Sequence, residues 1–354
     1  MIDEIKSKIK SGERINIEEA ISLYKEAELF ELSELALFVK RKNSGDYIFY
    51  NKNFHIEPTN ICRFHCRFCS YRKDATDVGA RDMSLNDIVK YIKDHYYKGI
   101  TEVHLVGGVH PNYTIHNYCD MIRTVRENVP SEVAIKAFSA IEHIAVIEQA
   151  GLSYKEGLSM MKEAGMNSIT GGGAEILDDI LRKDICPDKP MSQKWLDLHH
   201  AAHDLGIKTG ATMLYGHCET LQQRIEHMGT IRDLQDTTHG FSSFIPLKYR
   251  SQNNNMSEIG ECSIIEDLRT LAISRIFLDN VPHIKAYTPM YGMLISQMAL
   301  LFGGDDLDGT VMATTDIYSS AGVETCSNTE EKLKEMISEI GFQAVERDTY
   351  YQAI

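Results

Sequence analysis

The spacing of apolar residues along the chain predicts an alternation of strands and helices. Short, mostly apolar runs bounded by glycine, proline or polar turn residues are typical of buried strands. Such runs occur at residues 54–58, 101–106, 132–138, 167–170, 208–214, 241–245, 283–287 and 310–313. Between them, apolar residues recur every three or four positions, as on one face of a helix, at residues 85–96, 118–126, 154–164, 192–205 and 221–234. This alternation predicts an α/β protein with a parallel sheet covered by helices.

The eight predicted strands are most simply closed into a (βα)8 barrel of the TIM type. A doubly wound sheet is the alternative, but the glycine-rich turns lack its G-x-G-x-x-G pattern. We expect a helical cap over residues 1–50, in which Asn16 and Glu19 match a helix start. The barrel is expected over residues 51–325, with residues 326–354 packed on it as a C-terminal tail. Active sites in such barrels lie at the carboxyl ends of the strands.

The length and composition of the chain fit one large globular barrel. Its net charge and its apolar runs exclude some classes of partner. The chain has 354 residues, 43% of them hydrophobic and 25% charged, and a net charge of −14. An acidic surface argues against binding to nucleic acids. No apolar run approaches the roughly 18 residues of a membrane span, and residues 1–6 do not resemble the start of a signal peptide. We expect a cytoplasmic protein with reduced thiols and no nucleic-acid or membrane partner.

Three cysteines lie within one short stretch, Cys62, Cys66 and Cys69, with C-x3-C-x2-C spacing. Thiolates on such a loop can each bind one iron of a [4Fe–4S] cluster, in which cysteine is the usual ligand at all four corners. A fourth local ligand is missing, and a metal centre that lacks one protein ligand can bind a reactant. Zinc is the alternative, but zinc motifs usually contain two separated cysteine pairs, and no second pair is present.

Glycine-rich stretches follow two of the predicted strands. Gly107-Gly108, after the second strand, permits a close approach of the backbone to a ligand, although an ordinary turn would look the same. Residues 171–173, after the fourth strand, are all glycine but lack the Gly-Lys-Ser/Thr of a P-loop. Glu175, which follows them, could complement a helix dipole or hold a ribose hydroxyl or an ammonium group.

Polar residues near strand ends are candidates for binding or proton transfer. His217 could transfer protons, since its reference pKa lies near neutrality, or could be a satisfied polar residue at the barrel rim. Lys136 is either a surface residue or an inward cation that faces an anion. Lys248 and Arg250 form a candidate carboxylate clamp, with a solvated loop as the alternative.

Three further motifs are assigned structural roles. His199 and His203 could chelate a metal, but the His-Glu-x-x-His context is absent, so we expect a surface or rim position. Residues 305–309 resemble a turn before the last strand and lack the length of an EF-hand loop. Ser139 and Glu142 match a capping box.

Together these motifs resemble the radical S-adenosylmethionine (SAM) enzymes, and within them the aminofutalosine synthases of the futalosine route to menaquinone. The resemblance covers roughly residues 45–325 and rests on residues 55–62, 69–71, 107–111, 136–138, 171–175, 211–217, 278–280, 283–287 and 305–310. It implies that the three clustered cysteines hold a [4Fe–4S] cluster whose open iron binds SAM. It also implies contacts to SAM from Phe68, Tyr71, Gly107, Gly108 and Glu175. Where the family often has Glu after the two glycines, this chain has Val109, so that side-chain contact is absent.

The resemblance implies a transferase that consumes SAM as a substrate. A 5′-deoxyadenosyl radical adds to the enol ether of 3-[(1-carboxyvinyl)oxy]benzoate, and rearrangement with loss of the carboxylate gives aminofutalosine. An electron donor such as flavodoxin or ferredoxin would reduce the cluster. The dianionic aryl substrate needs cations, for which Lys136, Lys248 and Arg250 are candidates. Cys218 is expected to point away from the site, because thiols give up hydrogen atoms readily.

Two alternative functions follow from the same motifs. The first is a related radical SAM reaction, such as that of the cyclic dehypoxanthine futalosine synthases or of the radical enzymes of deazaflavin assembly. These enzymes share the cysteine loop but differ in the later stretches. The second is a non-catalytic iron–sulfur electron carrier or iron sensor, in which the protein would be expected to ligate all four irons.

Overall fold

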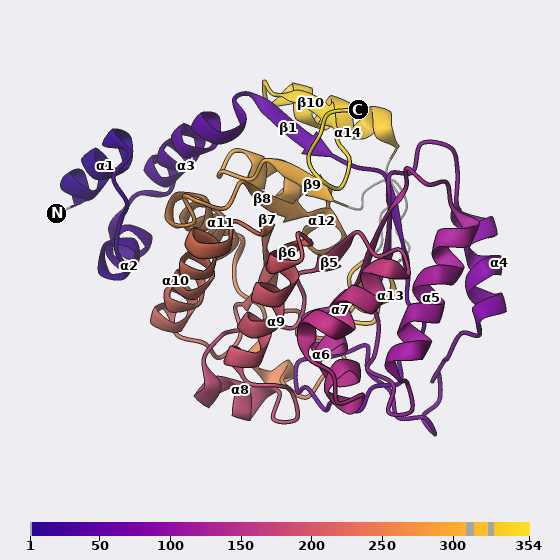
Figure 1. Ribbon diagram of the computed structural model, residues 1–354. Coiled ribbons are helices and arrows are strands. Elements are labelled where there is room, and N and C mark those ends of the chain that lie inside the picture. The colour runs from indigo at the N-terminus through magenta and orange to yellow at the C-terminus, as the bar shows by residue number, and fades with distance from the viewer. Residues whose placement is uncertain (1, 309–314, 325–328) are drawn as a thin grey trace.

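Ten described strands, all paired in parallel, form one curled sheet in the order β10-β1-β9-β8-β7-β6-β5-β4-β3-β2. The computed structural model describes residues 2–308, 315–324 and 329–354 (Figure 1). Its strands are β1 (Tyr47–Tyr50), β2 (Asn53–Ile56), β3 (Glu102–Leu105), β4 (Ala134–Ser139), β5 (Ser168–Thr170), β6 (Lys208–Tyr215), β7 (Phe241–Lys248), β8 (His283–Tyr287), β9 (Asp306–Asp308) and β10 (Gln343–Glu346).

The sheet curls until its two ends meet at one short link. β1 lies next to one end of the sheet and β2 forms the other end, yet only Asn51 and Lys52 connect them. From Tyr50 to Asn53 the chain makes three steps, which span at most about 11 Å, so the ends must be adjacent. The Lys52 carbonyl accepts the Thr101 N–H at 2.9 Å, next to β3. The predicted TIM-type fold is therefore confirmed, with its closure at an interrupted strand.

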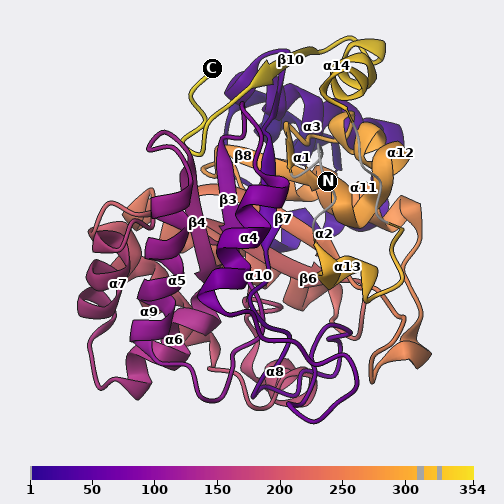
Figure 2. The ribbon, with the colours of Figure 1, turned by 90° about the vertical axis from the view of Figure 1, so that its right-hand side faces the viewer.

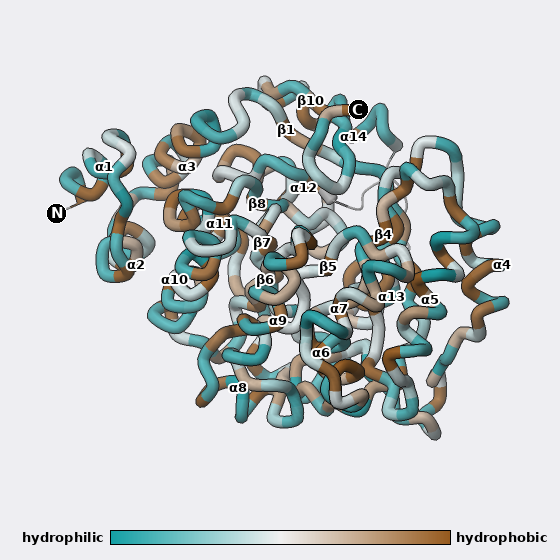
Figure 3. The backbone as a smooth tube through the Cα atoms, in the orientation of Figure 1, coloured by the Kyte–Doolittle hydropathy of each residue, from teal (hydrophilic) through white to brown (hydrophobic). Residues whose placement is uncertain are grey.

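Helices cover the outer face of the sheet (Figure 1, Figure 2). Hydrophilic residues occupy much of these outer helices (Figure 3), whereas β2, β3 and β4 are buried along their whole length. None of the described helices combines the length and the apolar character needed to cross a bilayer. The helices after β2 are α4 (Leu85–His95), α5 (Ile115–Asn128), α6 (Ala140–Gln149), α7 (Tyr154–Glu163), α8 (Asp179–Ile185), α9 (Ser192–Asp204), α10 (Leu221–Thr238), α11 (Ile264–Phe277), α12 (Thr288–Leu300), α13 (Asp316–Ser319) and α14 (Glu330–Glu339).

Three helices precede the sheet: α1 (Ile2–Ser11), α2 (Ile17–Glu26) and α3 (Leu29–Ser44). α2 packs against α10 and α11, α3 packs against α11, and α1 packs on α2 and α3 (Figure 1). The predicted start of α2 is confirmed. The Asn16 side chain accepts the Glu19 N–H at 2.8 Å, and the Glu19 carboxylate accepts the Asn16 N–H at 2.9 Å. α3 packs against α11 and buries Leu32 completely.

The predicted strands between residues 54 and 287 are confirmed as β2 to β8. The prediction of a turn at residues 305–309 is wrong for the described part, because Asp306–Asp308 form β9. Asp306 is tolerated in a buried strand because the Arg347 guanidinium lies 2.8 Å from its carboxylate. The predicted strand at residues 310–313 lies outside the described residues.

Besides β9, two more strands were not predicted, β1 and β10. Residues 47–50 were expected to be helical, but their Tyr-Ile-Phe-Tyr sequence is rich in residues that favour strands. β1 pairs with β10 on one side and with β9 on the other, so residues distant in sequence stabilise it. Its four residues are too few to show a periodic pattern by themselves.

We predict that Leu32→Ala lowers the free energy of unfolding by about 2–5 kcal/mol, because it leaves a cavity between α3 and α11. Phe30→Ala, on the same helix, is the matched control, since Phe30 is 79% exposed. Its effect should stay within about 0.5 kcal/mol. Chemical denaturation measures both values, and equal losses would contradict the packing of α3 on the barrel.

Candidate active site

The cysteine loop follows β2 and is fixed by backbone hydrogen bonds to the segment after β3. The Val109 N–H donates to Cys62 Sγ at 3.3 Å, and the Arg63 N–H donates to the Val109 carbonyl at 2.9 Å. Within the loop, the Cys69 N–H donates to the Cys66 carbonyl at 3.2 Å. The loop therefore lies at the carboxyl ends of β2 and β3, where a barrel of this kind has its active site.

Two further segments hold the other side of the cysteine loop. The Arg67 N–H donates to the Ile185 carbonyl at 2.8 Å, at the end of α8, and the Arg67 guanidinium contacts Asp184 at 2.6 Å. The Asn255 N–H, after β7, donates to the Arg67 carbonyl at 2.7 Å. Strands from opposite parts of the sheet thus position one loop across the mouth of the barrel.

The three clustered thiols fit an iron–sulfur cluster better than a single ion. In the described part of the chain, no three His, Cys, Asp or Glu side chains converge on one metal ion. The cysteines of a cluster bind separate irons, so their sulfurs need not converge. Burial raises the pKa of the Cys66 and Cys69 thiols, so bound iron is needed to hold them as thiolates near neutral pH. Cys62, Cys66 and Cys69 would be its ligands.

Gly107 and Gly108 lie against the chain that leads into the cysteine loop. A Cβ on Gly107 would lie 2.7 Å from the Thr59 carbonyl oxygen, and one on Gly108 would lie 2.5 Å from the Ile61 carbonyl oxygen. The Gly108 N–H donates to the Thr59 carbonyl at 2.7 Å. This close approach requires glycine at both positions.

The predicted capping box at the start of α6 is confirmed and also reaches these glycines. The Glu142 carboxylate accepts the Ser139 N–H at 2.6 Å and the Gly107 N–H at 3.1 Å. Burial raises the pKa of Glu142 to about 7, although these donors oppose the shift. Glu142 therefore links the end of β4 to the glycines after β3.

The other residues expected to contact SAM lie within the cysteine loop or beside it. The Tyr71 hydroxyl donates to the Thr59 carbonyl at 3.2 Å. The Lys189 ammonium lies 5.3 Å from the centre of the Phe68 ring and 2.5 Å from the Glu175 carboxylate. Burial opposes ionisation of Glu175, but the Lys189 ammonium lowers its pKa, so Glu175 is ionised beside the cysteine loop.

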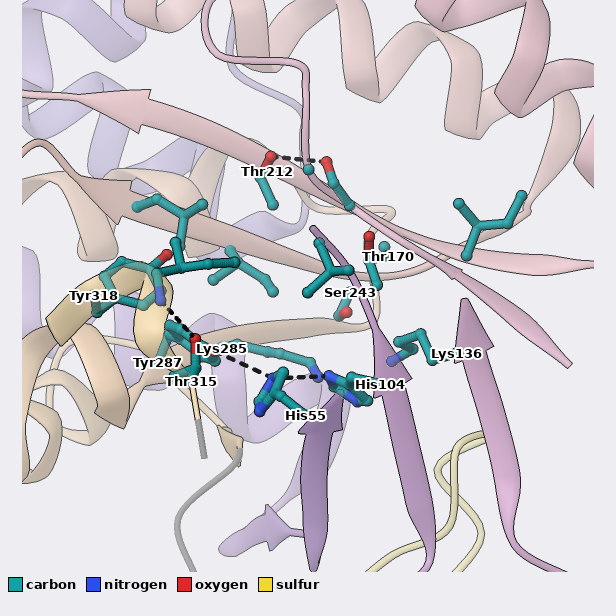
Figure 4. Close-up of a pocket in the computed structure, with 18 residues that line it drawn as sticks. His55, His104, Lys136, Thr170, Thr212, Ser243, Lys285, Tyr287, Thr315 and Tyr318 are labelled. Atoms are coloured by element: carbon teal, nitrogen blue, oxygen red, sulfur yellow. Dashed lines mark hydrogen bonds between the residues drawn. The ribbon is translucent and has the colours of Figure 1, made fainter. Parts of the chain in front are cut away.

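A cavity of about 220 Å³ lies inside the barrel (Figure 4). Its wall includes apolar side chains from β5 and β7, backbone from the glycines after β5, and α13. The described residues that line it are His55, His104, Val106, Lys136, Ile169, Thr170, Gly171, Gly172, Gly210, Thr212, Ser243, Ile245, Leu247, Lys285, Tyr287, Thr315, Ile317 and Tyr318. None of these described residues is an Asp or a Glu.

Basic side chains gather at one end of this cavity. His104 Nδ1 lies 3.2 Å from His55 Nε2, and Figure 4 shows the nitrogen ends of Lys136 and Lys285 pointing toward these imidazoles. Behind the wall, Glu102 lies 2.9 Å from His104 Nε2 and 3.4 Å from the Lys136 ammonium. Lys136 was expected to be either a surface residue or an inward cation that faces an anion, and the structure supports the inward cation.

The other predicted polar residues do not line the cavity. The His217 imidazole is buried, contacts the Leu214 carbonyl at 3.0 Å and lies 3.3 Å from Glu219, as expected of a satisfied rim residue. Burial lowers the pKa of His217. The Arg250 guanidinium contacts Glu261 at 2.7 Å, and the Lys248 ammonium contacts Asp267 at 2.9 Å. Each of these two cations is thus already paired with an acidic side chain.

The structure also places the remaining candidates. Cys218 is exposed and does not line the cavity. The surface or rim position expected for His199 is wrong, because its imidazole is fully buried and contacts the Thr209 hydroxyl at 2.9 Å. His203 contacts the same hydroxyl at 2.9 Å. This pair is a packing feature between α9 and β6.

Sequence reasoning missed His55, His104 and Lys285 as cavity residues. Each is a polar residue inside a short buried strand, as Lys136 is. A basic residue between apolar neighbours of a buried strand was the signal that could have identified all four. The face to which each side chain points depends on strand register, which the sequence pattern does not determine.

Comparisons with known proteins identify relatives along the whole chain. The profile of the Radical SAM superfamily matches residues 56–231, and that of the CofH/MqnC C-terminal region matches residues 238–354. The chain is 37% identical to the aminodeoxyfutalosine synthase of Thermus thermophilus, over 99% of this chain and 95% of that protein. It is 38% identical to the 5-amino-6-(D-ribitylamino)uracil–L-tyrosine 4-hydroxyphenyl transferase of Methanococcoides burtonii, over 99% of each.

A solved structure supports the fold. Methylornithine synthase (PylB) superposes with a TM-score of 0.75, covering 96% of this chain and 97% of that chain. The two sequences are only 14% identical, so this likeness concerns the fold alone.

We predict that Gly108→Ala lowers the iron bound after anaerobic reconstitution at least about twofold, because its Cβ must displace the backbone that leads to Cys62. Gly229→Ala on α10 is the control, since its Cβ would meet no atom closer than 3.8 Å. Iron and sulfide analysis of the two purified variants gives the comparison. Full iron content in Gly108→Ala would show that this contact does not position the cysteine loop.

Proposed function

Because the chain belongs to the radical SAM superfamily, we propose that it joins the 5′-deoxyadenosyl group of SAM to 3-[(1-carboxyvinyl)oxy]benzoate on the route to menaquinone. The product is 6-amino-6-deoxyfutalosine; methionine leaves from SAM, and the carboxylate of the enol ether leaves, with uptake of water, as bicarbonate. Enzymes of this superfamily use a [4Fe–4S] cluster and SAM, which together supply the 5′-deoxyadenosyl radical. The relatedness to aminodeoxyfutalosine synthases supports a role in the futalosine pathway. The charge of the cavity inside the barrel supports this choice of substrate.

A dianionic aryl substrate matches the lining of the cavity. Lys136 on β4 and Lys285 on β8 come from strands that are not neighbours in the sheet, yet both reach the cavity. Their ammonium groups can each form a charge-assisted hydrogen bond to one substrate carboxylate. The apolar side chains of Ile245 and Leu247 offer a surface for the aryl ring. The wall thus combines two anion-binding groups with an apolar face.

The same lining disfavours tyrosine as the substrate. Tyrosine carries an ammonium group, which is best held by a carboxylate, and no described residue of the cavity wall is acidic. Sequence identity does not separate the two activities, because the chain is 37% identical to a relative of one kind and 38% identical to one of the other. The cavity charge is therefore the observation that favours the benzoate.

The residues of this chain orient the substrate and shield it. Holding the alkene of the substrate close to the reacting carbon of SAM converts the addition into an effectively unimolecular step. Good hydrogen-atom donors must be kept away from the radical, and the exposed position of Cys218, outside the cavity wall, agrees with this need. The protein thus contributes by positioning and shielding the substrate, while the cofactors supply the reactive group.

The electron donor in this proposal is a small acidic protein such as flavodoxin or ferredoxin. Radical SAM enzymes need a reductant. Arg63 lies between Cys62 and Cys66, and Lys73 follows Cys69, in a chain of net charge −14; Arg63 is exposed. Positive charge beside the cluster site would attract an acidic partner.

Anaerobic incubation with SAM, dithionite and each candidate substrate tests the proposal. The candidates are the enol-ether benzoate, dehypoxanthine futalosine, and tyrosine together with 5-amino-6-(D-ribitylamino)uracil. Mass spectrometry should detect 6-amino-6-deoxyfutalosine with the benzoate and no adduct with the other two. A tyrosine-derived adduct, or a cyclised product from dehypoxanthine futalosine, would replace the proposed activity with that of a relative.

We predict that Lys136→Met raises the KM for the benzoate about 10- to 100-fold. Losing a hydrogen bond to a charged group costs about 1.5–3 kcal/mol, and 1.4 kcal/mol corresponds to about tenfold. The iron content should not change, since Lys136 lies outside the cysteine loop.

Arg250→Met is the matched control, because Arg250 pairs with Glu261 and does not line the cavity. Its KM should stay within about twofold of the wild-type value. Steady-state kinetics with saturating SAM compare the two variants. Similar KM values for Lys136→Met and Arg250→Met would argue against Lys136 as a substrate-binding group.

A further inference from the structure

Arg347 reaches the base of the cavity from the segment that follows β10. The Arg347 side chain is fully buried, and the backbone N–H of Arg347 donates to the Tyr50 carbonyl at 2.9 Å. The guanidinium contacts the Glu102 carboxylate at 2.7 Å and the Asp306 carboxylate at 2.8 Å. One arginine thus bridges β3 and β9 beneath the cavity.

These two carboxylates are also the partners of the cavity lysines. Glu102 lies 3.4 Å from the Lys136 ammonium, and Asp306 lies 3.4 Å from the Lys285 ammonium. Both lysines line the cavity, whereas Glu102, Asp306 and Arg347 do not. Arg347 therefore competes with each lysine for the same carboxylate, from the side opposite the cavity.

The charge of Arg347 determines the net charge of the buried group that it forms with Glu102, Asp306, Lys136 and Lys285. Among the described side chains, Lys136, Lys285 and Arg347 face the two carboxylates of Glu102 and Asp306, so this set is positive overall when its histidines are neutral. With Arg347 removed, the two lysines would be balanced by the two acids. In a low-dielectric interior, that balance would draw each ammonium onto its carboxylate and away from a ligand.

Other contacts fix Arg347 in this position. Its guanidinium lies 4.2 Å from the centre of the Tyr351 ring, and the Tyr351 hydroxyl donates to Asp306 at 2.6 Å. β10 pairs with β1 along four residues, which anchors the segment that carries Arg347. The C-terminal segment is thus part of the structure that surrounds the cavity.

We propose that Arg347 is a positioning residue for substrate binding: by neutralising Glu102 and Asp306, it leaves Lys136 and Lys285 to bind the two carboxylates of a dianionic aryl ligand. This inference rests on the proposed function for the identity of the substrate. The role proposed for Arg347 concerns only the binding of an anion, so it can be tested separately from the reaction.

The test measures equilibrium binding to the cluster-loaded, SAM-bound enzyme by calorimetry. The ligands are the enol-ether benzoate and isophthalate, an unreactive aryl dianion. Arg347→Gln should weaken both at least about tenfold, since it removes one of the cations that make the cavity positive. Arg347→Lys keeps the charge but loses the two-point contact with Asp306 and the stacking on Tyr351, so its affinity should lie between that of Arg347→Gln and that of the wild type.

A rescue variant separates the charge effect from a structural one. Arg347→Gln combined with Glu102→Gln restores the net charge and should recover affinity to within about threefold of the wild type. Arg275→Gln is the control for lost packing, because Arg275 is also fully buried and pairs with Asp305 at 3.1 Å. It should lower the thermal midpoint and leave dianion binding unchanged.

Each outcome supports or rejects either the positioning role of Arg347 or the proposed reaction. Unchanged affinity in folded Arg347→Gln, an equal loss in Arg275→Gln, no recovery in the double variant, or no isophthalate binding by the wild type would each overturn the positioning role. Isophthalate binding that depends on Arg347, together with no adduct from the benzoate, would support the positioning role and reject the proposed reaction.

Discussion

Two buried carboxylates, Glu102 on β3 and Asp306 on β9, lie inside the barrel where water cannot solvate them. Removing a carboxylate from water costs several kcal/mol even after the protein relaxes, so each needs close cations or hydrogen-bond donors. Arg347 contacts both. The lysines that face the cavity contact the same two groups, so the positions of all these charges are set together.

The mouth of the barrel depends on a steric constraint instead. Gly107 and Gly108 lie so close to Thr59 and Ile61 that no side chain fits between the two backbones. Because the contact joins the segments after β2 and β3, the position of the cysteine loop follows from the pairing of those strands. Electrostatics thus shapes the base of the site, and backbone packing shapes its rim.

The sequence predicted most strands and the cysteine loop because their signals are local. Apolar runs bounded by turn residues identify β2 to β8, and the cysteine spacing lies within eight residues. The pairing of Arg250 with Glu261 and of Lys248 with Asp267 was not predictable, because it depends on how the segment after β7 folds back. Similarly, β1 and β10 are short strands that are stabilised by each other, and neither carries a periodic pattern of its own.

The contact between Arg347 and Glu102 joins residues 245 positions apart in the chain. On the ribosome, β3 and β4 emerge long before the segment that carries Arg347. Until that segment is synthesised, Glu102 and Asp306 lack their contacts with Arg347. Contacts of such long range form slowly, since loop closure must precede them. The pairing of β10 with β1 and the contact of Arg347 with Glu102 can therefore form only after almost the whole chain has been synthesised.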